Sequence, residues 1–453
     1  MLYGLLKGLA VLALRWFYRD IEVIGLEAIP QTGPIILAVN HPNSVIDALA
    51  VVTTVPRRIT LTAKATLFRI PGLGSLLRAL HFVPLRRVVD EHAGGSAEAT
   101  DRERNEAAFD AIVGVLSAGG AVLIFPEGRS HSESLMSPLK TGLARVALQA
   151  REAGGVRGIQ IIAVGLTFDQ KWRARSRLAV IIGESIDLDG WASTASASVP
   201  ALMERVDVAL RAVTLNFPTV DEAATVEEIS RTLSALFDSP RPLGAPDRPL
   251  AEEVALIRRV AAARKSRDPE VESAAADLTA RLRSFRSELK ARGLAIGDLA
   301  IPTGLVPGAR FVVREGLVIA GPGILALWGR INHALPLSLA ARLAQHLSAG
   351  PEDPAMYTLG LALAFLAIAY AIQTTIVWRL AGPAWATAYL LTLPFFGIWD
   401  ERFRDRMRRA AKRVRGFWHL RLDPSLQPRL MQEAATLRAD ALRIEELARG
   451  RDA

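Results

Sequence analysis

The stretch VNHPNSVID, residues 39–47, places an imidazole, His41, directly after an apolar run of strand length and a carboxylate, Asp47, shortly after it. The stretch FPEGRS, residues 125–130, follows a second apolar run and supplies an acid, a glycine and a guanidinium in consecutive positions. In α/β folds, residues at strand ends lie where such folds usually keep their sites. The two stretches therefore predict an α/β domain with a site formed by two strand-end loops.

The spacing of His41 and Asp47 limits how they can meet. On one continuous helix, 100° per residue would separate the two side chains by about 240°. His41 is therefore expected in a loop before a helix, because a residue that precedes a proline, here Pro42, is pushed to extended dihedrals. Asp47 then has two interpretations: it caps the helix together with Ser44, or it holds one ring nitrogen of His41 while the other accepts a proton from a hydroxyl.

The composition of the 453-residue chain narrows the function classes. Half of the residues are hydrophobic, the formal net charge is +9 and the pI is about 10.2. A basic, apolar chain indicates anionic lipid, phosphorylated substrates or nucleic acid as partners. The chain has no cysteine, which excludes disulfides, thiolate metal sites and a cysteine nucleophile. No set of His, Asp and Glu has metal-ligand spacing, and His81, His131 and His333 are interpreted as ordinary polar residues.

Strand-like runs alternate with helical stretches from residue 33 to about residue 190. This alternation predicts an α/β domain, assigned to residues 21–237, with a mostly parallel sheet flanked by helices. Strands are expected at 21–24, 35–39, 59–63, 122–125, 160–166 and 178–182, and helices at 44–53, 74–80, 101–116, 139–150 and 200–213. The proline-rich residues 238–249 predict a linker.

Apolar segments outside this domain predict membrane contact. Residues 1–20 are expected to form a helix in the membrane interface, with Trp16 and Phe17 at headgroup level, or else a helix that packs on the core. Residues 250–350 predict a helical and interfacial region, in which the uncharged run 316–328 is too short to span a bilayer.

Residues 356–398 contain two uncharged runs separated by Arg379. Runs of this length predict a transmembrane or re-entrant hairpin, with tryptophans in the interface belts. A dense basic block follows, and the positive-inside bias predicts that residues 400–453 form a basic helical tail in the cytoplasm, on the same side as the α/β domain. The tail includes an amphipathic helix, 430–447, whose partner stays undetermined.

Several motifs together resemble the phospholipid/glycerol acyltransferase (PlsC-like) superfamily, over roughly residues 15–220. They are NHPN and the aspartate at 40–47, KATLFRIPGLG at 64–74, FVPLRR at 82–87, FPEG at 125–128, SPLKTG at 137–142 and IAVGL at 162–166. Two departures from the usual pattern occur: five residues instead of four separate His41 from Asp47, and Arg129 follows Gly128 without an intervening residue. Both departures are similar to the glycerol-3-phosphate/dihydroxyacetone-phosphate acyltransferase branch.

The resemblance implies a membrane-bound enzyme that moves a fatty acyl group from acyl-CoA or acyl-carrier protein to glycerol 3-phosphate or dihydroxyacetone phosphate, without a cofactor. It implies His41 as general base and Asp47 as its orienting partner. The other implied site residues bind the acceptor: Arg86, Arg87, Arg129, Lys64 and Lys140 its phosphate, Glu127 its hydroxyls, and Gly128 by close backbone approach.

Two alternatives stay open. The first is a lysophospholipid (1-acylglycerol-3-phosphate) acyltransferase, which differs in acceptor. The second is a non-catalytic membrane protein that binds anionic lipid through the basic block. Membrane lipids are partners in every case, and nucleic acid is not expected, because the basic residues adjoin a hydrophobic hairpin.

Overall fold

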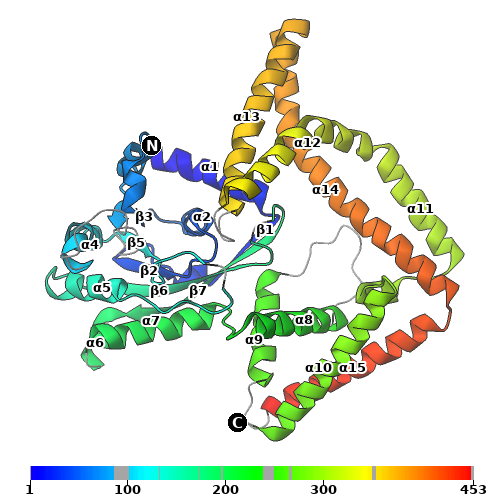
Figure 1. The fold of residues 1–453 in the computed structure, drawn as a ribbon, viewed down its shortest axis with the longest axis horizontal. Helices are drawn as coiled ribbons and strands as arrows, with labels where there is room; N and C mark the ends of the chain where they lie inside the picture. Colours follow the sequence, from blue (N-terminus) through cyan, green and yellow to red (C-terminus); the bar gives the residue numbers. More distant parts are fainter. Residues whose placement is uncertain are drawn as a thin grey trace. The chain divides into compact units, whose positions relative to one another are not determined.

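The computed structural model describes residues 2–85, 101–131, 133–171, 173–194, 197–237, 249–264, 268–348 and 354–449. The chain divides into two compact units (Figure 1). The first comprises Met1–Pro218 and Ala344–Gly360, and the second comprises Thr219–Leu343 and Leu361–Ala453. Nearly all of the predicted linker, 238–249, lies outside the described residues.

The first unit is built on a seven-stranded sheet with the order β1-β7-β6-β2-β5-β3-β4. Every neighbouring pair is parallel except β6 and β7. The strands are β1 Asp20–Ile24, β2 Ile35–Val39, β3 Ile59–Lys64, β4 Val83–Leu85, β5 Ala121–Ile124, β6 Gln160–Phe168 and β7 Arg177–Asp187. The predicted mostly parallel sheet is confirmed, and β4 is the strand that the sequence prediction missed.

The connections explain the strand directions. Parallel neighbours require a crossover, and helices provide it: α2 (Val45–Thr54), α4 (Asp101–Ser117) and α5 (Gly142–Glu152) each lie between two strands of the chain. Only residues 169–176 join β6 to β7, which is too short for a crossover helix, so this pair is antiparallel.

The central strands are covered on both faces. All residues of β2 and β5 are buried, as expected for apolar strands between two helical layers. Ile36 and Ala38 of β2 face a core that contains side chains of α4, α5 and α7 (Val199–Val213). Ile35, Leu37 and Val39 face a second core with α1 (Leu2–Phe17) and α2. Because successive side chains of a strand point to opposite faces of the sheet, β2 contributes to both cores.

The C-terminal end of α1 lies in the core of the domain and not in a membrane interface. Phe17 was expected at headgroup level, but it is 1% exposed and belongs to the core beside Leu14 and Tyr18. The last turn of α1 therefore packs on the sheet. Its outer face carries the exposed leucines Leu2, Leu5, Leu9 and Leu12.

The second unit is helical. Its elements include α8 Val220–Phe237, α9 Leu250–Arg264, α10 Pro269–Ala291, α11 Leu305–Ala320, α14 Pro383–Leu422 and α15 Leu426–Arg449, together with the larger parts of α12 Pro322–Leu347 and α13 Pro354–Ala381. The tail residues Leu430, Leu437 and Ile444 pack in one core with side chains of α8 and α10. This core supplies the partner of the amphipathic tail helix. It also explains why α8 belongs to this unit, although the predicted acyltransferase domain extended to residue 237.

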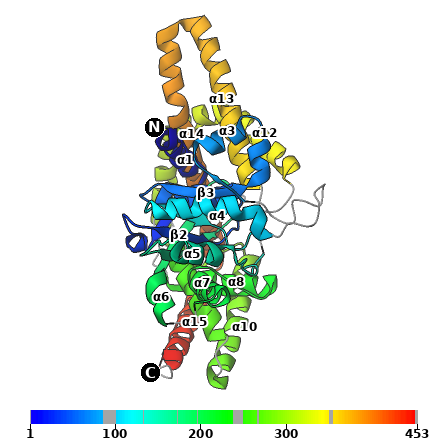
Figure 2. The same cartoon turned by 90° about the vertical axis from the view of Figure 1, so that its left-hand side faces the viewer.

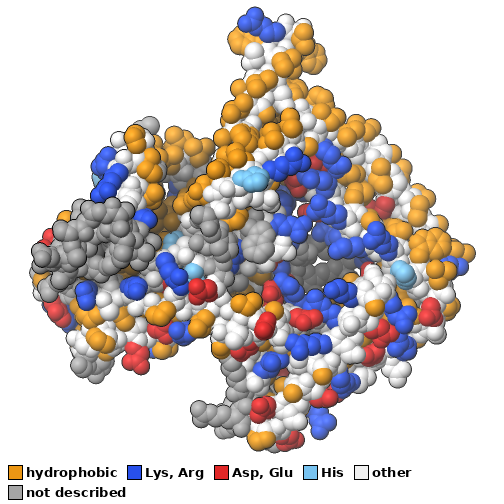
Figure 3. Space-filling model, viewed as in Figure 1, with side chains coloured by type: hydrophobic (Ala, Val, Ile, Leu, Met, Phe, Trp, Pro, Cys, Tyr) orange, Lys and Arg blue, Asp and Glu red, His pale blue; other side chains and the backbone are white. Residues whose placement is uncertain are grey.

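One described helix, α13, is long and apolar enough to cross a membrane. The pair α11 and α12 passes the same test only when taken together, with a 47° bend between them. Figure 2 shows α13 beside the first part of α14, and Gly382 joins the two helices. Figure 3 shows many hydrophobic side chains on this helix pair. The second predicted apolar run does not form a separate helix, because α14 continues through the basic block to Leu422.

Candidate active site

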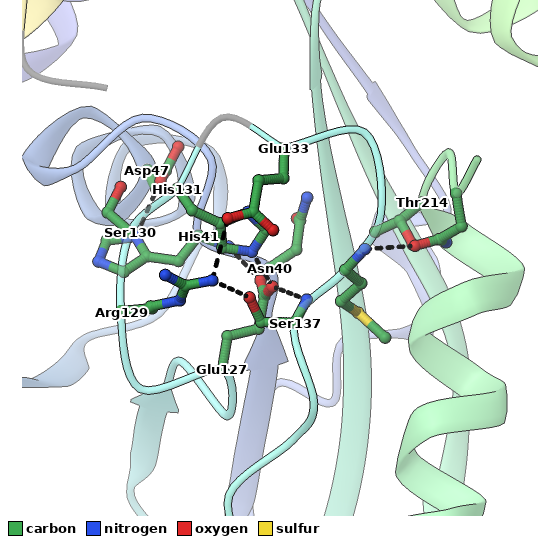
Figure 4. Close-up of polar contacts among 12 residues, drawn as sticks. Asn40, His41, Asp47, Glu127, Arg129, Ser130, His131, Glu133, Ser137 and Thr214 are labelled. Atoms are coloured by element: carbon green, nitrogen blue, oxygen red, sulfur yellow. Dashed lines mark hydrogen bonds and ion pairs between the residues drawn. The ribbon is translucent and has the colours of Figure 1, made fainter. Parts of the chain in front are cut away.

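The two loops singled out in the sequence meet at one edge of the sheet. β2 and β5 are parallel neighbours, so the loops that follow them leave the sheet at the same edge. The backbone N–H of His41 donates to Glu127 Oε1 at 2.9 Å, and the backbone N–H of His131 donates to the carbonyl of His41 at 3.1 Å. Ser44 N–H donates to Ser130 Oγ at 2.9 Å. Figure 4 shows His41, Glu127, Ser130 and His131 together.

The side chains of His41 and Asp47 are hydrogen-bonded, with 2.9 Å between Nδ1 and Oδ2. The same Asp47 oxygen accepts the backbone N–H of Asn43 at 2.7 Å, and Asp47 is completely buried. Ser44 makes no side-chain cap bond. Of the two interpretations of Asp47, the geometry therefore agrees with the one in which the carboxylate holds the ring.

The loop between these two residues accommodates five intervening positions by an unusual backbone conformation. Ser44, directly before α2, has φ 51° and ψ −131°. A positive φ is costly for a residue with a Cβ, and such strain is kept where surrounding contacts over-determine it. Here the bond from Ser44 N–H to Ser130 Oγ is such a contact.

Burial and hydrogen bonding act in opposite directions on Asp47. Burial raises the pKa of the Asp47 carboxyl, and the hydrogen bond from His41 opposes that shift. When the carboxyl is ionised it can only accept, so His41 Nδ1 then carries the proton and Nε2 presents a lone pair. The ring is stacked on Phe125, with 3.8 Å between centroids, and its side chain is 12% exposed. No partner of Nε2 occurs among the described residues.

Two asparagines fix the loop that carries His41. Asn40 pairs with the backbone of Leu166 in both directions, donating to its carbonyl at 3.1 Å and accepting its N–H at 2.7 Å. Asn43 is 1% exposed and donates to Tyr18 Oη at 3.2 Å and to the Lys171 carbonyl at 3.1 Å. These bonds join β6 and the end of α1 to the loop on either side of His41.

Glu127, which the resemblance implied would bind the hydroxyls of the acceptor, lies in the interior of the domain. It is 3% exposed, and its two oxygens accept from the His41 backbone, from Ser137 N–H at 2.9 Å and from His131 Nε2. Its observed role is to tie together the strand-end loops. His131, interpreted from sequence as ordinary, is 9% exposed and pairs with this carboxylate. The four-residue spacing between Glu127 and His131 was the signal available in the sequence.

The other predicted acceptor residues lie around this pair. Arg129 is 58% exposed, and its Nη2 donates to Glu133 Oε1 at 3.0 Å and Ser137 Oγ at 3.2 Å. Gly128 has φ 72° and closes a turn by donating to the Phe125 carbonyl, so a glycine is needed for the turn itself. Lys140 is exposed beside Gly128, and Lys64 is the half-buried last residue of β3.

Arg86 and Arg87 lie outside the described residues. Among the residues that the structure describes, no group of three or more His, Asp or Glu lies close enough to hold a metal ion.

Comparisons with known proteins match the part of the chain that contains these two loops. Residues 20–167 match the family model described as Acyltransferase. Glycerol-3-phosphate O-acyltransferases 2 and 1 of Saccharomyces cerevisiae are 30% identical over 132 residues and 26% over 135 residues, each covering 28% of this chain and 18% of the relative. An uncharacterised acyltransferase of Schizosaccharomyces pombe is 20% identical over 299 residues, which cover 48% of this chain and 44% of the relative.

Among solved structures, the 1-acyl-sn-glycerophosphate (LPA) acyltransferase PlsC of Thermotoga maritima is similar, with a TM-score of 0.36 and 21% identity over 47% of this chain and 78% of that chain. The chain spans less than half the length of the curated relatives it matches. The match to the acyltransferase family covers residues 20–167, about a third of the chain. The curated relatives that the sequence resembles include the two yeast glycerol-3-phosphate acyltransferases.

Proposed function

We propose that this protein transfers a fatty acyl group from acyl-CoA or acyl-carrier protein to the hydroxyl of glycerol 3-phosphate or dihydroxyacetone phosphate. The observation that carries the proposal is the hydrogen bond between His41 Nδ1 and the buried Asp47 carboxylate, which leaves Nε2 as a base. The match to the acyltransferase family and to two glycerol-3-phosphate acyltransferases supports this choice of reaction and acceptor.

The reaction follows from that arrangement. His41 Nε2 takes the proton of the acceptor hydroxyl as its oxygen attacks the thioester carbonyl. The carbonyl oxygen becomes negatively charged, the carbon–sulfur bond breaks when the carbonyl re-forms, and the proton on His41 passes to the leaving thiolate. Asp47 stabilises the charged ring while it holds the proton. A thioester is already activated, so no covalent enzyme intermediate and no cofactor are needed.

The proposed enzyme is bound to the membrane. α13 and the first half of α14 form the predicted hairpin around Gly382 in this proposal, with the α/β domain on the cytoplasmic side. The support for insertion is the apolar length of α13 and the tryptophans Trp378 and Trp385, which are 60% and 68% exposed on either side of Gly382.

The test is acyl transfer by the purified full chain. Labelled acyl-CoA and acyl-carrier protein are each offered with glycerol 3-phosphate, dihydroxyacetone phosphate and 1-acylglycerol 3-phosphate, and the products are identified by mass spectrometry. A monoacylated product from either of the first two acceptors is expected. Acylation of 1-acylglycerol 3-phosphate alone would favour the lysophospholipid acyltransferase. Salt-sensitive binding to anionic vesicles without any transfer would favour the non-catalytic alternative.

Arg129 provides a prediction about acceptor binding. Removing a charge-assisted hydrogen bond costs about 1.5–3 kcal/mol, so Arg129→Ala is expected to raise KM for the phosphorylated acceptor roughly 10- to 100-fold. Glu133→Gln is expected to lower the same KM, because Glu133 competes for the guanidinium. Steady-state kinetics measure both effects.

The matched control is Arg205→Ala, which removes an exposed arginine of α7 outside the two loops. It is expected to leave the acceptor KM unchanged. A rise in KM for the acyl donor, with an unchanged KM for the acceptor, in Arg129→Ala would contradict the assigned role.

A further inference from the structure

The part of α12 that lies in the second unit distributes its side chains in an unusual way. The positions that are buried are polar or small: Ala326, Gly329, Asn332, His333, Pro336 and Ala340. Asn332 and His333 are only 6% and 5% exposed. The opposite stripe consists of large aliphatic side chains that are 45% to 68% exposed, namely Ile324, Leu327, Ile331, Leu335 and Leu339. A helix in water buries its apolar stripe, so this pattern is inverted.

The exposed stripe is costly in water. Exposing a Leu or Ile side chain to water is unfavourable relative to burying it, and five such side chains lie on one face. Contiguous exposed apolar surface of this kind marks an interaction site. Hydrophobic side chains gather in the same way along α13 and the first half of α14 (Figure 3).

The buried polar groups of α12 are satisfied by the neighbouring helices. His333 Nδ1 donates to the Gly329 carbonyl at 2.7 Å, and its Nε2 accepts from Tyr370 Oη of α13 at 2.6 Å. Tyr389 of α14 donates to Asn332 Oδ1 at 2.5 Å. Hydrogen bonds that satisfy the buried polar groups of α12, here from neighbouring helices and from its own backbone, suit a hydrocarbon environment.

Small residues allow α12 and α14 to approach closely. A Cβ on Gly329 would lie 2.0 Å from the Phe396 carbonyl oxygen, and one on Gly397 would lie 2.8 Å from His333 Nε2. Glycines at the contact, with large side chains pointing outward, are typical of helices that pack in membranes.

A pair of opposite charges lies directly after the apolar half of α14. Asp400 is 3% exposed and accepts from Arg330 of α12 at 3.0 Å, directly after the apolar half of α14. Residues 383–399 between Gly382 and Asp400 measure about 26 Å as a helix, close to a bilayer's hydrocarbon core. The exposed Arg402, Arg408 and Arg415 follow Asp400 and complement anionic headgroups.

We propose that α12 is a third membrane-embedded helix, with Ile324, Leu327, Ile331, Leu335 and Leu339 against lipid acyl chains and its polar side turned to α13 and α14. Residues 322–341 are long enough for this and contain one charged residue, Arg330, which is paired with Asp400. The proposal rests on the membrane hairpin of the proposed function and extends it to a segment expected from sequence to be interfacial.

The absence of cysteine from the chain makes a labelling test straightforward. Ile331→Cys and Leu335→Cys report on α12. Leu391→Cys, at a position that is 72% exposed, reports on the hairpin. Val208→Cys, at a position of α7 that is 53% exposed, is the matched control. Each spin-labelled full chain is reconstituted in vesicles of phosphatidylcholine and phosphatidylglycerol. Relaxation by oxygen, which concentrates in lipid, is compared with relaxation by a water-soluble nickel chelate.

The expected result is a shift from nickel to oxygen relaxation at residues 331, 335 and 391, with the opposite ratio at residue 208. Nickel access at residues 331 and 335 with oxygen access at residue 391 would overturn the inference and leave the hairpin standing. Nickel access at all four positions would overturn both. Labels on α12 shielded from both reagents would mean that protein, such as a second copy of the chain, covers this face, which also overturns the inference.

Discussion

Purified His41→Ala protein is expected to transfer acyl groups roughly 10²- to 10⁴-fold more slowly than the wild type, because a positioned general base contributes about that much. The loss should appear in kcat, with little change in KM for the acyl donor, since the removed group acts on the attacking hydroxyl. Single-turnover measurement with labelled acyl-CoA separates the chemical step from product release.

Two variants make this result interpretable. Asp47→Asn retains the shape of the buried carboxyl but cannot stabilise a charged ring, so it is expected to lower kcat in the same direction as His41→Ala. His419→Ala removes an exposed histidine of α14 that has no assigned role in the reaction, and it should retain wild-type kcat. An unchanged rate of acyl transfer by a folded His41→Ala protein would contradict the proposed role of His41 as general base.

Glu127→Ala is expected to destabilise the acyltransferase domain by roughly 3–5 kcal/mol, as removal of one member of a buried pair does. The substitution leaves the His41 and Ser137 N–H groups and the His131 ring without their acceptor. Unsatisfied buried donors each cost about 1–3 kcal/mol, and these costs do not add fully. Urea unfolding measures the loss as a lower midpoint with an unchanged slope.

Glu127→Gln should lose less stability, because the amide oxygen still accepts one or two of these bonds. The exposed Glu152 at the end of α5 provides the control, and Glu152→Gln should change stability by less than about 0.5 kcal/mol. Since Glu127 holds the His41 backbone, kcat of Glu127→Gln should fall even in the folded protein. A Glu127→Ala protein of wild-type stability would show that Glu127 does not tie the loops together.

The fold was largely predictable from local patterns. The apolar runs that became β2 and β5 are surrounded by turn signals, and their uniform apolarity is itself the signature of strands covered on both faces. β4 was missed because three residues, one of them Pro84, carry no periodic pattern. The packing of α8 with the helices of the second unit was not predictable, since its amphipathic pattern does not identify the surface that it covers.

For the candidate site, the sequence predicted the pairing of His41 with Asp47 but not the contacts of Glu127. His41 and Asp47 could be paired from their chemistry, and the structure brings them to 2.9 Å. Whether Glu127 faces substrate or protein depends on which donors surround it, and those donors come from residues 41, 131 and 137. No local pattern encodes such a convergence.

The sequence by itself determined the mostly parallel sheet and the residue types in the loops that follow its central strands. Both are local properties, because they depend on the pattern of apolar residues and on short motifs at strand ends. Only the tertiary structure decided that Glu127 and His131 hold the loops from within, and that α12 turns its polar side inward. Both depend on which surface lies opposite a side chain, and that surface comes from distant parts of the chain.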